Sequence, residues 1–315
     1  MATMTGKSWV RAHLSMLAVL LIATYAFIVY AEKLYPLRIS DNVAFDAKVR
    51  FLKDSQRISG SDAAIIGSSM GLINLNGKTL EEKSKKINRL VNISSWGEQV
   101  LQVEQELQLI ADNKKIKYVI YPLQMDDFAF DKQHDLDFEE VNKYIKGEFT
   151  LYPYNRVFLN IFSFLKAFYN YQSYHQTDHR YPSLLFDETG GVNYRIYGEN
   201  IEKERWKKNN VYGLSKNNFE ALKRIAKLLQ DQNIKFIVLI TPLRLPLLEA
   251  SPEWKKQFEE FTRLMETTAL ESRFNFLDLH HLLMLEDEFF ADSSHLNYEG
   301  SVLLSEIVAN YVDGV

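Results

Sequence analysis

Short apolar runs alternate with amphipathic stretches from about Asp62 to the end of the chain, and this alternation constrains the fold more than any other feature. The runs are almost wholly apolar, as strands are when helices cover both faces of a parallel sheet. The stretches between them repeat their apolar residues with the period of a helix. The pattern therefore predicts an α/β domain over residues 62–315, with a parallel sheet between two layers of helices.

Five runs are predicted to be strands, at residues 63–67, 90–93, 117–123, 235–241 and 274–279. Two of the predicted helices are marked by apolar faces, formed by Val100, Val103, Leu107 and Ile110 and by Phe219, Leu222, Ile225 and Leu229. A third starts at Ser251-Pro252, an N-cap followed by a first-turn proline, and the last begins near Asn297. Open parallel sheets bind ligands at the carboxyl ends of their strands, so polar residues just after those ends are the candidates for a site.

The region from about residue 128 to 212 breaks the alternation. It holds nine of the seventeen tyrosines between Tyr144 and Tyr197. We interpret it as an insertion packed beside the sheet. Its aromatic residues are interpreted as a core of its own, with the lining of a groove as the alternative.

The N-terminus contains an uncharged run of eighteen residues, Leu14 to Ala31, which is just long enough to cross a bilayer as a helix. Lys7 and Arg11 precede it, as in a signal anchor or signal peptide. We predict a short cytoplasmic N-terminus (1–13), an uncleaved transmembrane anchor (14–31), a juxtamembrane linker (32–61) and an extracytoplasmic domain. Cleavage after Ala31 is the alternative. Basic residues also follow the run, but long domains are translocated largely regardless of such charges.

Composition excludes several classes of function. Lys and Arg number 37 against 41 Asp and Glu, and no basic run is interleaved with aromatic residues, so nucleic acid is not expected as a partner. The absence of cysteine rules out disulfides, a thiolate nucleophile and cysteine-ligated zinc. No Gly-x-Gly-x-x-Gly or phosphate-binding loop is present. No cofactor is expected.

Two polar groups stand where the sheet would bring them together. The strand at 63–67 runs into Ser68-Ser69-Met70-Gly71, a small-residue turn that can expose a nucleophile together with backbone N–H groups. Asp292 precedes His295 by three residues, so its carboxylate can reach Nδ1–H and leave Nε2 free as a base. Each group alone also fits a turn former or a helix cap. Together they predict a triad of Ser69, His295 and Asp292.

These blocks resemble those of the SGNH, or GDSL-like, hydrolase superfamily. Its first block, Gly-Asp-Ser, corresponds to Gly67-Ser68-Ser69, and its last block, Asp-x-x-His, to Asp292 to His295. Serine in the middle of the first block is more similar to the membrane-anchored branch that modifies cell-envelope polymers, which includes alginate O-acetyltransferase-like proteins and the D-alanyl-lipoteichoic-acid transfer protein. The resemblance spans Asp62 to the C-terminus without the insertion. It implies a flavodoxin-like SGNH fold in which Ser69 is the nucleophile, His295 the base and Asp292 its orienter.

The resemblance also implies an oxyanion hole. The N–H groups of Ser69 and Gly97 would form it, since Gly97 looks like the glycine of the family's second block. The third block, Gly-x-Asn-Asp, is absent, and after the expected strand Gln124 is the residue that could supply a donor instead. Losing one donor costs roughly a hundredfold or more in rate. The departure therefore bears on efficient hydrolysis more than on the fold.

By this resemblance the chain is expected to carry out acyl transfer or ester hydrolysis on a cell-envelope polysaccharide through a covalent acyl-serine. The acceptor is that polysaccharide, another hydroxyl or water, and a multi-spanning membrane acyltransferase is the implied partner. Two alternatives stay open. One is a weakly active or inactive SGNH-like protein that binds a glycan or scaffolds an assembly, and the other is a cytoplasmic lipase-like enzyme that uses its N-terminal helix to sit on the membrane.

Other histidines give weaker signals. His175 and His179 would present both imidazoles to a metal if they lay on a helix, but a surface loop is the favoured interpretation and no metal is expected. His280 and His281 follow Asp278 at a strand end. One of these rings is expected to line the site and the other to pack against the sheet.

Overall fold

The computed structural model describes residues 6–174, 185–197, 212–244 and 251–315, and all structural statements refer to them. The strands are β1 (Ala63–Ile65), β2 (Leu90–Asn92), β3 (Tyr118–Leu123), β4 (Lys235–Ile240) and β5 (Asn275–Asp278). The α-helices are α1 (Gly6–Ala31), α2 (Val43–Ser55), α3 (Ser69–Ile73), α4 (Gly77–Lys83), α5 (Val100–Glu106), α6 (Phe138–Lys146), α7 (Tyr152–Leu159), α8 (Ile161–Tyr174), α9 (Lys216–Asp231), α11 (Pro252–Ser272), α12 (Leu279–Leu282) and α13 (Tyr298–Gly314). Short 3-10 helices lie at Arg57–Gly60, Leu107–Leu109, Met125–Phe128 and Asp287–Phe289.

The five strands form one parallel sheet in the order β2-β1-β3-β4-β5. β1 pairs with β2 on one side and β3 on the other, so that Val91, Ala64 and Val119 lie abreast. This is the order of flavodoxin-like sheets, which bind ligands next to β1 and β3, where the winding reverses. The predicted fold class is therefore confirmed. Each predicted strand is present and is one or two residues shorter than expected.

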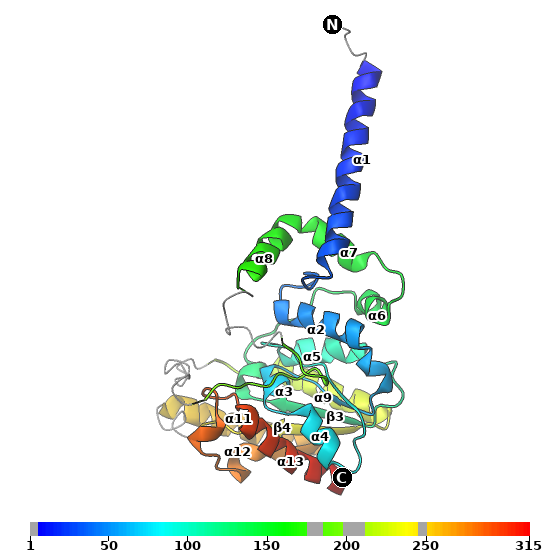
Figure 1. Ribbon diagram of the computed structural model, residues 1–315. Helices are drawn as coiled ribbons and strands as arrows, with labels where there is room; N and C mark the ends of the chain where they lie inside the picture. The colour runs from blue at the N-terminus through cyan, green and yellow to red at the C-terminus, as the bar shows by residue number, and fades with distance from the viewer. Residues whose placement is uncertain (1–5, 175–184, 198–211, 245–250) are drawn as a thin grey trace.

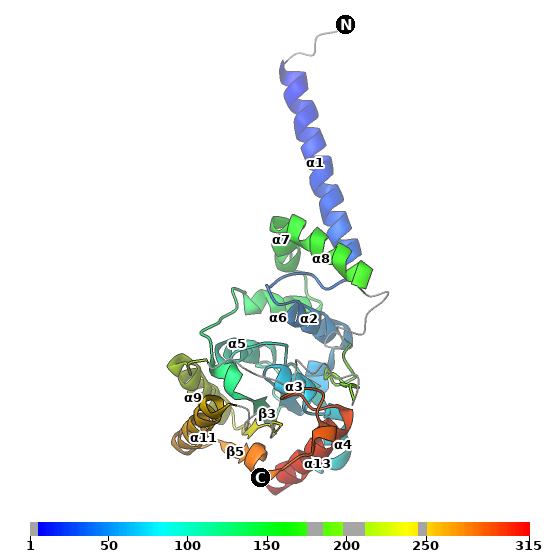
Figure 2. The ribbon, with the colours of Figure 1, turned by 90° about the vertical axis from the view of Figure 1, so that its left-hand side faces the viewer.

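Helices cover both faces of the sheet, as Figures 1 and 2 show. Val119 and Tyr121 of β3 belong to the core that includes residues of α2, α5, α9 and α11. Ile120 between them belongs to the core that includes α4 and α13. α5 ends at Glu106 and continues as a 3-10 helix, whereas its apolar period predicted a helix as far as Ile110.

The segment predicted as a juxtamembrane linker contains a folded helix. α2 buries Phe45, Val49 and Leu52 in the same core as α5 and α9. The Asn42 side chain caps its first turn by accepting the N–H groups of Ala44 and Phe45. Residues 43–55 are therefore part of the domain rather than a flexible connection.

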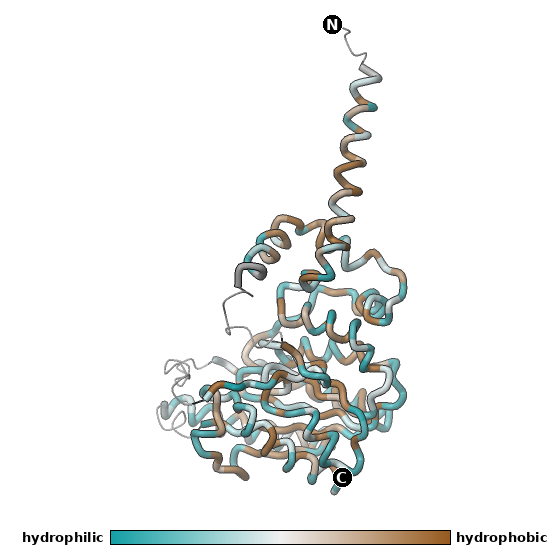
Figure 3. Tube along the Cα trace, in the orientation of Figure 1, coloured by the Kyte–Doolittle hydropathy of each residue, from teal (hydrophilic) through white to brown (hydrophobic). Residues whose placement is uncertain are grey.

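Two helices of the predicted insertion, α7 and α8, lie at the foot of α1 rather than beside the sheet, whereas α6 lies next to α2 (Figures 1 and 2). Tyr25 of α1 donates a hydrogen bond to Asn155 of α7 and stacks on Phe158. Phe27 of α1 packs edge-on against Phe164 of α8. Residues Ser8–Ala31 of α1 are long and apolar enough to cross a membrane, and Figure 3 shows this helix projecting from the rest of the chain.

Candidate active site

Ser69 is the first residue of α3, and a turn of three residues separates it from the carboxyl end of β1 at Ile65. The turn that lifts it from the sheet depends on Gly67, whose φ is +129°, and a Cβ there would meet the Tyr121 ring at 2.8 Å and the Pro122 carbonyl oxygen at 3.0 Å. Ser68 then caps α3 by accepting the N–H of Met70. Ser69 thus lies at the edge of the sheet where β2 and β3 flank β1.

A chain of hydrogen bonds joins Ser69, His295 and Asp292. The Ser69 Oγ lies 2.8 Å from His295 Nε2, and His295 Nδ1 lies 2.7 Å from Asp292 Oδ2. All three residues are buried. The structure therefore brings together the serine, histidine and aspartate that the sequence singled out, in the geometry a serine nucleophile and its base require.

Asp292 is held as a carboxylate. Burial works to raise its pKa, but the neighbouring His295 and hydrogen bonds from the side chain and backbone of His295 and from the Ser294 N–H lower it to about 2. The backbone N–H groups of Ser294 and His295 lie 2.9 and 2.8 Å from Asp292 Oδ1. An ionised carboxylate at Nδ1 fixes the tautomer of the ring and stabilises a positive charge on it.

Asn74, at the end of α3, fixes the histidine turn. Its side-chain amide donates to the Ser294 carbonyl at 3.0 Å, and its Oδ1 accepts the Leu296 N–H at 2.8 Å. Asn74 therefore holds both sides of His295 and joins the helix that carries the nucleophile to the loop that carries the base. Its role could not be predicted from the sequence, because a polar residue at the end of a short helix gives no signal of a partner more than two hundred positions away.

Two aromatic rings lie against His295. Trp96 stacks on it with ring centroids 5.0 Å apart and remains 36% exposed, so it forms the solvent side of the site. The Tyr194 ring is stacked beside the same imidazole, with ring centroids 6.3 Å apart. Tyr194 belongs to the predicted insertion, whose segment is fixed there by the Val192 N–H donating to Leu72 and the Tyr298 N–H donating to Tyr194. Part of the insertion therefore lies at the candidate site, which corresponds to the alternative interpretation of its aromatic residues as the lining of a groove.

The predicted oxyanion donors lie after the strands that flank β1. Gly97 follows β2, has φ of +77° and is exposed next to Trp96. Gln124 follows β3 and is buried. Its backbone N–H donates to Asp127 Oδ2 at 2.9 Å, and its side-chain amide is the predicted oxyanion donor. Ser69, as the first residue of α3, has an N–H without an intrahelical acceptor. Their roles as oxyanion donors remain a prediction.

His280 and His281 lie elsewhere. Burial and the neighbouring His281 lower the pKa of His280 to about 4, and its Nδ1 accepts the Leu243 N–H. His281 is exposed, pairs with Asp278 at 2.6 Å and lines a surface cavity with residues of α11. His280 packs in the interior, as we expect of one of the two rings. His281 faces the surface cavity that is lined in part by residues of α11. His175 and His179 lie outside the described residues.

One buried group among the described residues could hold a metal: Glu98, Glu106 and His134, whose ligand atoms lie within 4.8 Å of one another. His134 Nε2 is 2.9 Å from Glu106 Oε1 and 3.3 Å from Glu98 Oε2. Burial works to lower the pKa of His134, but hydrogen bonds to the two carboxylates raise it to about 10. Burial and the neighbouring Glu98 also raise the pKa of Glu106 to about 8, so bound protons reduce the negative charge of this buried group.

Comparisons with known proteins bear on the fold. A protein-family model matches residues 186–314, less than half of the chain but including Asp292 and His295. No curated protein matches.

Among solved structures, the chain is similar to an acetyl xylan esterase (12% identity, TM-score 0.45, 79% of this chain and 99% of that one). It is also similar to a lipase/acylhydrolase from Enterococcus faecalis (11%, 0.44, 80% and 95%) and a GDSL-like lipase from Bacteroides thetaiotaomicron (10%, 0.41, 80% and 87%).

Proposed function

We propose that the chain is a membrane-tethered serine enzyme of the esterase type, with Ser69 as nucleophile, His295 as base and Asp292 as its orienter. The observation that carries the proposal is the unbroken chain of hydrogen bonds from Ser69 through His295 to Asp292. The burial of all three residues supports the same interpretation, because the similar Asp278–His281 pair has the same Nδ1 contact but its imidazole is exposed.

In the first half-reaction, Ser69 Oγ attacks the carbonyl carbon of an ester while its proton passes to His295 Nε2. The negative charge on the carbonyl oxygen is held by N–H donors, for which Ser69, Gly97 and Gln124 are our candidates. The intermediate then collapses, the C–O bond to the leaving alkoxide breaks, and His295 returns the proton to that oxygen. Ser69 is left as an acyl ester.

In the second half-reaction, a hydroxyl takes the place of the leaving group. His295 removes the proton of this acceptor hydroxyl, and the oxygen of the acceptor attacks the acyl carbon. The bond from the acyl carbon to Ser69 Oγ then breaks, and Ser69 Oγ recovers the proton from His295. Water as acceptor makes an esterase, and a sugar hydroxyl makes an O-acyltransferase. Trp96 supports a sugar acceptor, because its partly exposed ring beside His295 offers an apolar face on which a sugar ring can stack.

The finer proposal is acyl transfer to or from a cell-envelope polysaccharide on the extracytoplasmic side of the membrane. It rests on the apolar α1 and on the resemblance of the Gly67-Ser68-Ser69 and Asp292 to His295 blocks to the membrane-anchored SGNH branch. The proposed partner is a multi-spanning acyltransferase that delivers the acyl group through the bilayer to Ser69.

The test is release of p-nitrophenol from p-nitrophenyl acetate by the full chain and by its Ser69→Ala and His295→Ala variants. Each substitution is expected to lower kcat/KM by roughly a thousandfold or more, because nucleophile and base act as a unit. A serine-directed fluorophosphonate is expected to label the wild type and not Ser69→Ala.

His281→Ala is the matched control. His281 has the same spacing from Asp278 as His295 has from Asp292, and the same Nδ1 contact. It should therefore retain full activity. An equal loss in His281→Ala, or a wild type that neither turns over nor is labelled, would contradict the proposal and favour a glycan-binding or scaffold protein.

A further inference from the structure

Five large apolar side chains are exposed on α7, on α8 and just before α7. They belong to Leu151, Leu159, Phe162, Leu165 and Tyr169, and Leu159, Phe162 and Tyr169 are 79%, 85% and 74% exposed. The polar residues exposed on the two helices as far as residue 170 are Asn155, Ser163, Lys166 and Asn170. We refer to the five apolar residues as the α7–α8 face. Phe162, Leu165 and Tyr169 are spaced so that they share one side of α8. Such a face needs an apolar environment, since an exposed apolar patch in water marks an interaction site.

The opposite side of α8 is already occupied. Phe164 is buried and packs against Phe27 of α1 and against Tyr35, and Phe168 contacts the same two rings. The α7–α8 face therefore points away from the core that holds α8 in place. Within the described ranges, no element of the chain covers it.

The length of α1 determines how deep in the bilayer the α7–α8 face would lie. A bilayer core about 30 Å thick needs about 20 helical residues, and Leu14 to Ala31 supplies eighteen uncharged ones, about 27 Å. All of this run must lie in the membrane for α1 to span it. Yet Tyr25 and Phe27, near its end, are the residues that contact α7 and α8. The two helices thus reach the same depth as the last turns of α1.

Charge agrees with this placement. From Phe149 to Tyr174 the chain has no acidic residue, and its charged side chains are Arg156 and Lys166. Lys166 is exposed on α8. A segment rich in Phe and Tyr with cationic but no anionic groups suits the interface of a bilayer that contains anionic lipids.

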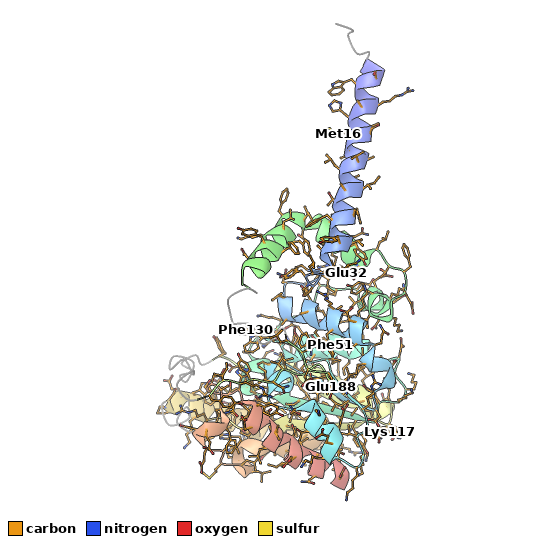
Figure 4. All side chains as sticks on the ribbon, in the orientation of Figure 1. Met16, Glu32, Phe51, Lys117, Phe130 and Glu188 are labelled. Atoms are coloured by element: carbon orange, nitrogen blue, oxygen red, sulfur yellow. The ribbon has the colours of Figure 1, made fainter. Side chains whose placement is uncertain are left out.

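The joint between α1 and the domain is fixed. Glu32, just after α1, accepts hydrogen bonds from Tyr144 at 2.6 Å and Tyr154 at 2.7 Å and also pairs with Lys53. Figure 4 shows Glu32 at the foot of α1, where the helix meets the rest of the chain. Because α1 cannot swivel freely against α7, the α7–α8 face keeps its place beside it.

We propose that the α7–α8 face lies in the membrane interface, as a second attachment to the same bilayer that α1 crosses. The occupant is the lipid surface, with anionic headgroups near Lys166 and acyl chains against Phe162 and Leu159. The proposal rests on the proposed membrane tether, and it does not depend on the chemistry at Ser69.

Single cysteines in the full chain test this, because the wild type has none. Phe162→Cys and Leu159→Cys are labelled with an NBD fluorophore, and the protein is placed in phospholipid nanodiscs that contain phosphatidylglycerol. The controls are Val19→Cys in the middle of α1 and Leu270→Cys on α11, exposed 64% and 81%. NBD emission shifts to the blue in an apolar environment, and a nitroxide on the lipid acyl chains quenches it only there.

The expected result is blue-shifted, lipid-quenched emission at 159, 162 and 19, and water-like, unquenched emission at 270. A quenched label at 19 with water-like labels at 159 and 162 overturns the interfacial placement, and leaves the face to a protein partner. Water-like labels at 19, 159 and 162 alike overturn the tether itself. Activity of the same samples toward p-nitrophenyl acetate reports separately on Ser69.

Discussion

Three histidines of this chain follow an aspartate by three residues, and in two of these Asp-x-x-His sequences the hydrogen bonds are almost the same. Asp278 contacts His281 Nδ1 at 2.6 Å, and Asp292 contacts His295 Nδ1 at 2.7 Å. His281 is exposed, whereas His295 is buried and reaches Ser69. The chemistry that the second turn can perform therefore comes from its surroundings rather than from the spacing of its residues.

Asp292→Asn keeps the base, His295, but removes the carboxylate that orients its ring. This variant therefore tests the role of the carboxylate by itself. An amide can donate to the ring but cannot stabilise the imidazolium, and it favours the wrong tautomer. We expect kcat toward p-nitrophenyl acetate to fall by roughly 10⁴-fold. Asp278→Asn should leave kcat unchanged, and a comparable fall in that variant would contradict the assignment.

The same carboxyl should make stability depend on pH. Its pKa is lowered from 3.8 to about 2 in the folded chain, so its ionised form is stabilised by folding. That contribution, about 2 kcal/mol, is present above pH 3.8 and is lost as pH falls through 2. Urea unfolding of the wild type and of Asp292→Asn should show a difference that narrows between pH 5 and pH 2. A constant difference would mean that Asp292 titrates normally.

At the scale of elements, the strands could be predicted because their apolar runs are short and almost unbroken. α2 could not, because its buried side includes Lys48 and Asp46 as well as Phe45. Lys48 Nζ donates to the Asn92 carbonyl at 3.0 Å and also to that of Gly190, partners that only the fold supplies. In sequence, a lysine indicates a surface residue, so the pattern of this region predicts a linker rather than a buried helix.

Like the elements of the fold, the residues of the candidate site could be predicted only in part. Ser69 and His295 follow or precede regular elements, and their positions in the chain identified them. Tyr194 lies within a tyrosine-rich region where nothing distinguishes it, and its place beside His295 depends on the path of residues 185–197 over α3. Residues that act by closing a site around others have no local signature.

Asn74 tests how α3 and the histidine turn are joined. Asn74→Ala leaves the Leu296 N–H and the Ser294 carbonyl buried without this partner, which costs about 1–3 kcal/mol for each group. We expect a lower midpoint of urea unfolding and a fall in kcat with little change in KM, because the base is displaced.

Asn74→Asp keeps an acceptor for Leu296 but buries a carboxylate against the Ser294 carbonyl oxygen. At neutral pH it should therefore be no more stable than Asn74→Ala. If Asn74→Ala lowers stability and leaves kcat unchanged, Asn74 is structural only.

At the scale of the whole molecule, the direction of insertion decides which compartment the site faces. We expect the domain to lie outside the cytoplasm, with the N-terminus inside. In intact cells, a membrane-impermeant maleimide should then label Leu270→Cys. Ser8→Cys, at the start of the candidate span, should be labelled only after permeabilisation. The reverse pattern would place the enzyme on the cytoplasmic face.

The contacts of Glu32 with Tyr144, Tyr154 and Lys53 also limit where this enzyme can work. A domain joined to its membrane anchor by a flexible linker samples a hemisphere whose radius grows with the length of the linker. Here no flexible segment separates α1 from the domain, so the proposed membrane anchor would hold Ser69 at one height above the bilayer. Under the proposed function, polymers that extend away from the cell would then be out of reach, and a polysaccharide would be modified while it is at the membrane surface.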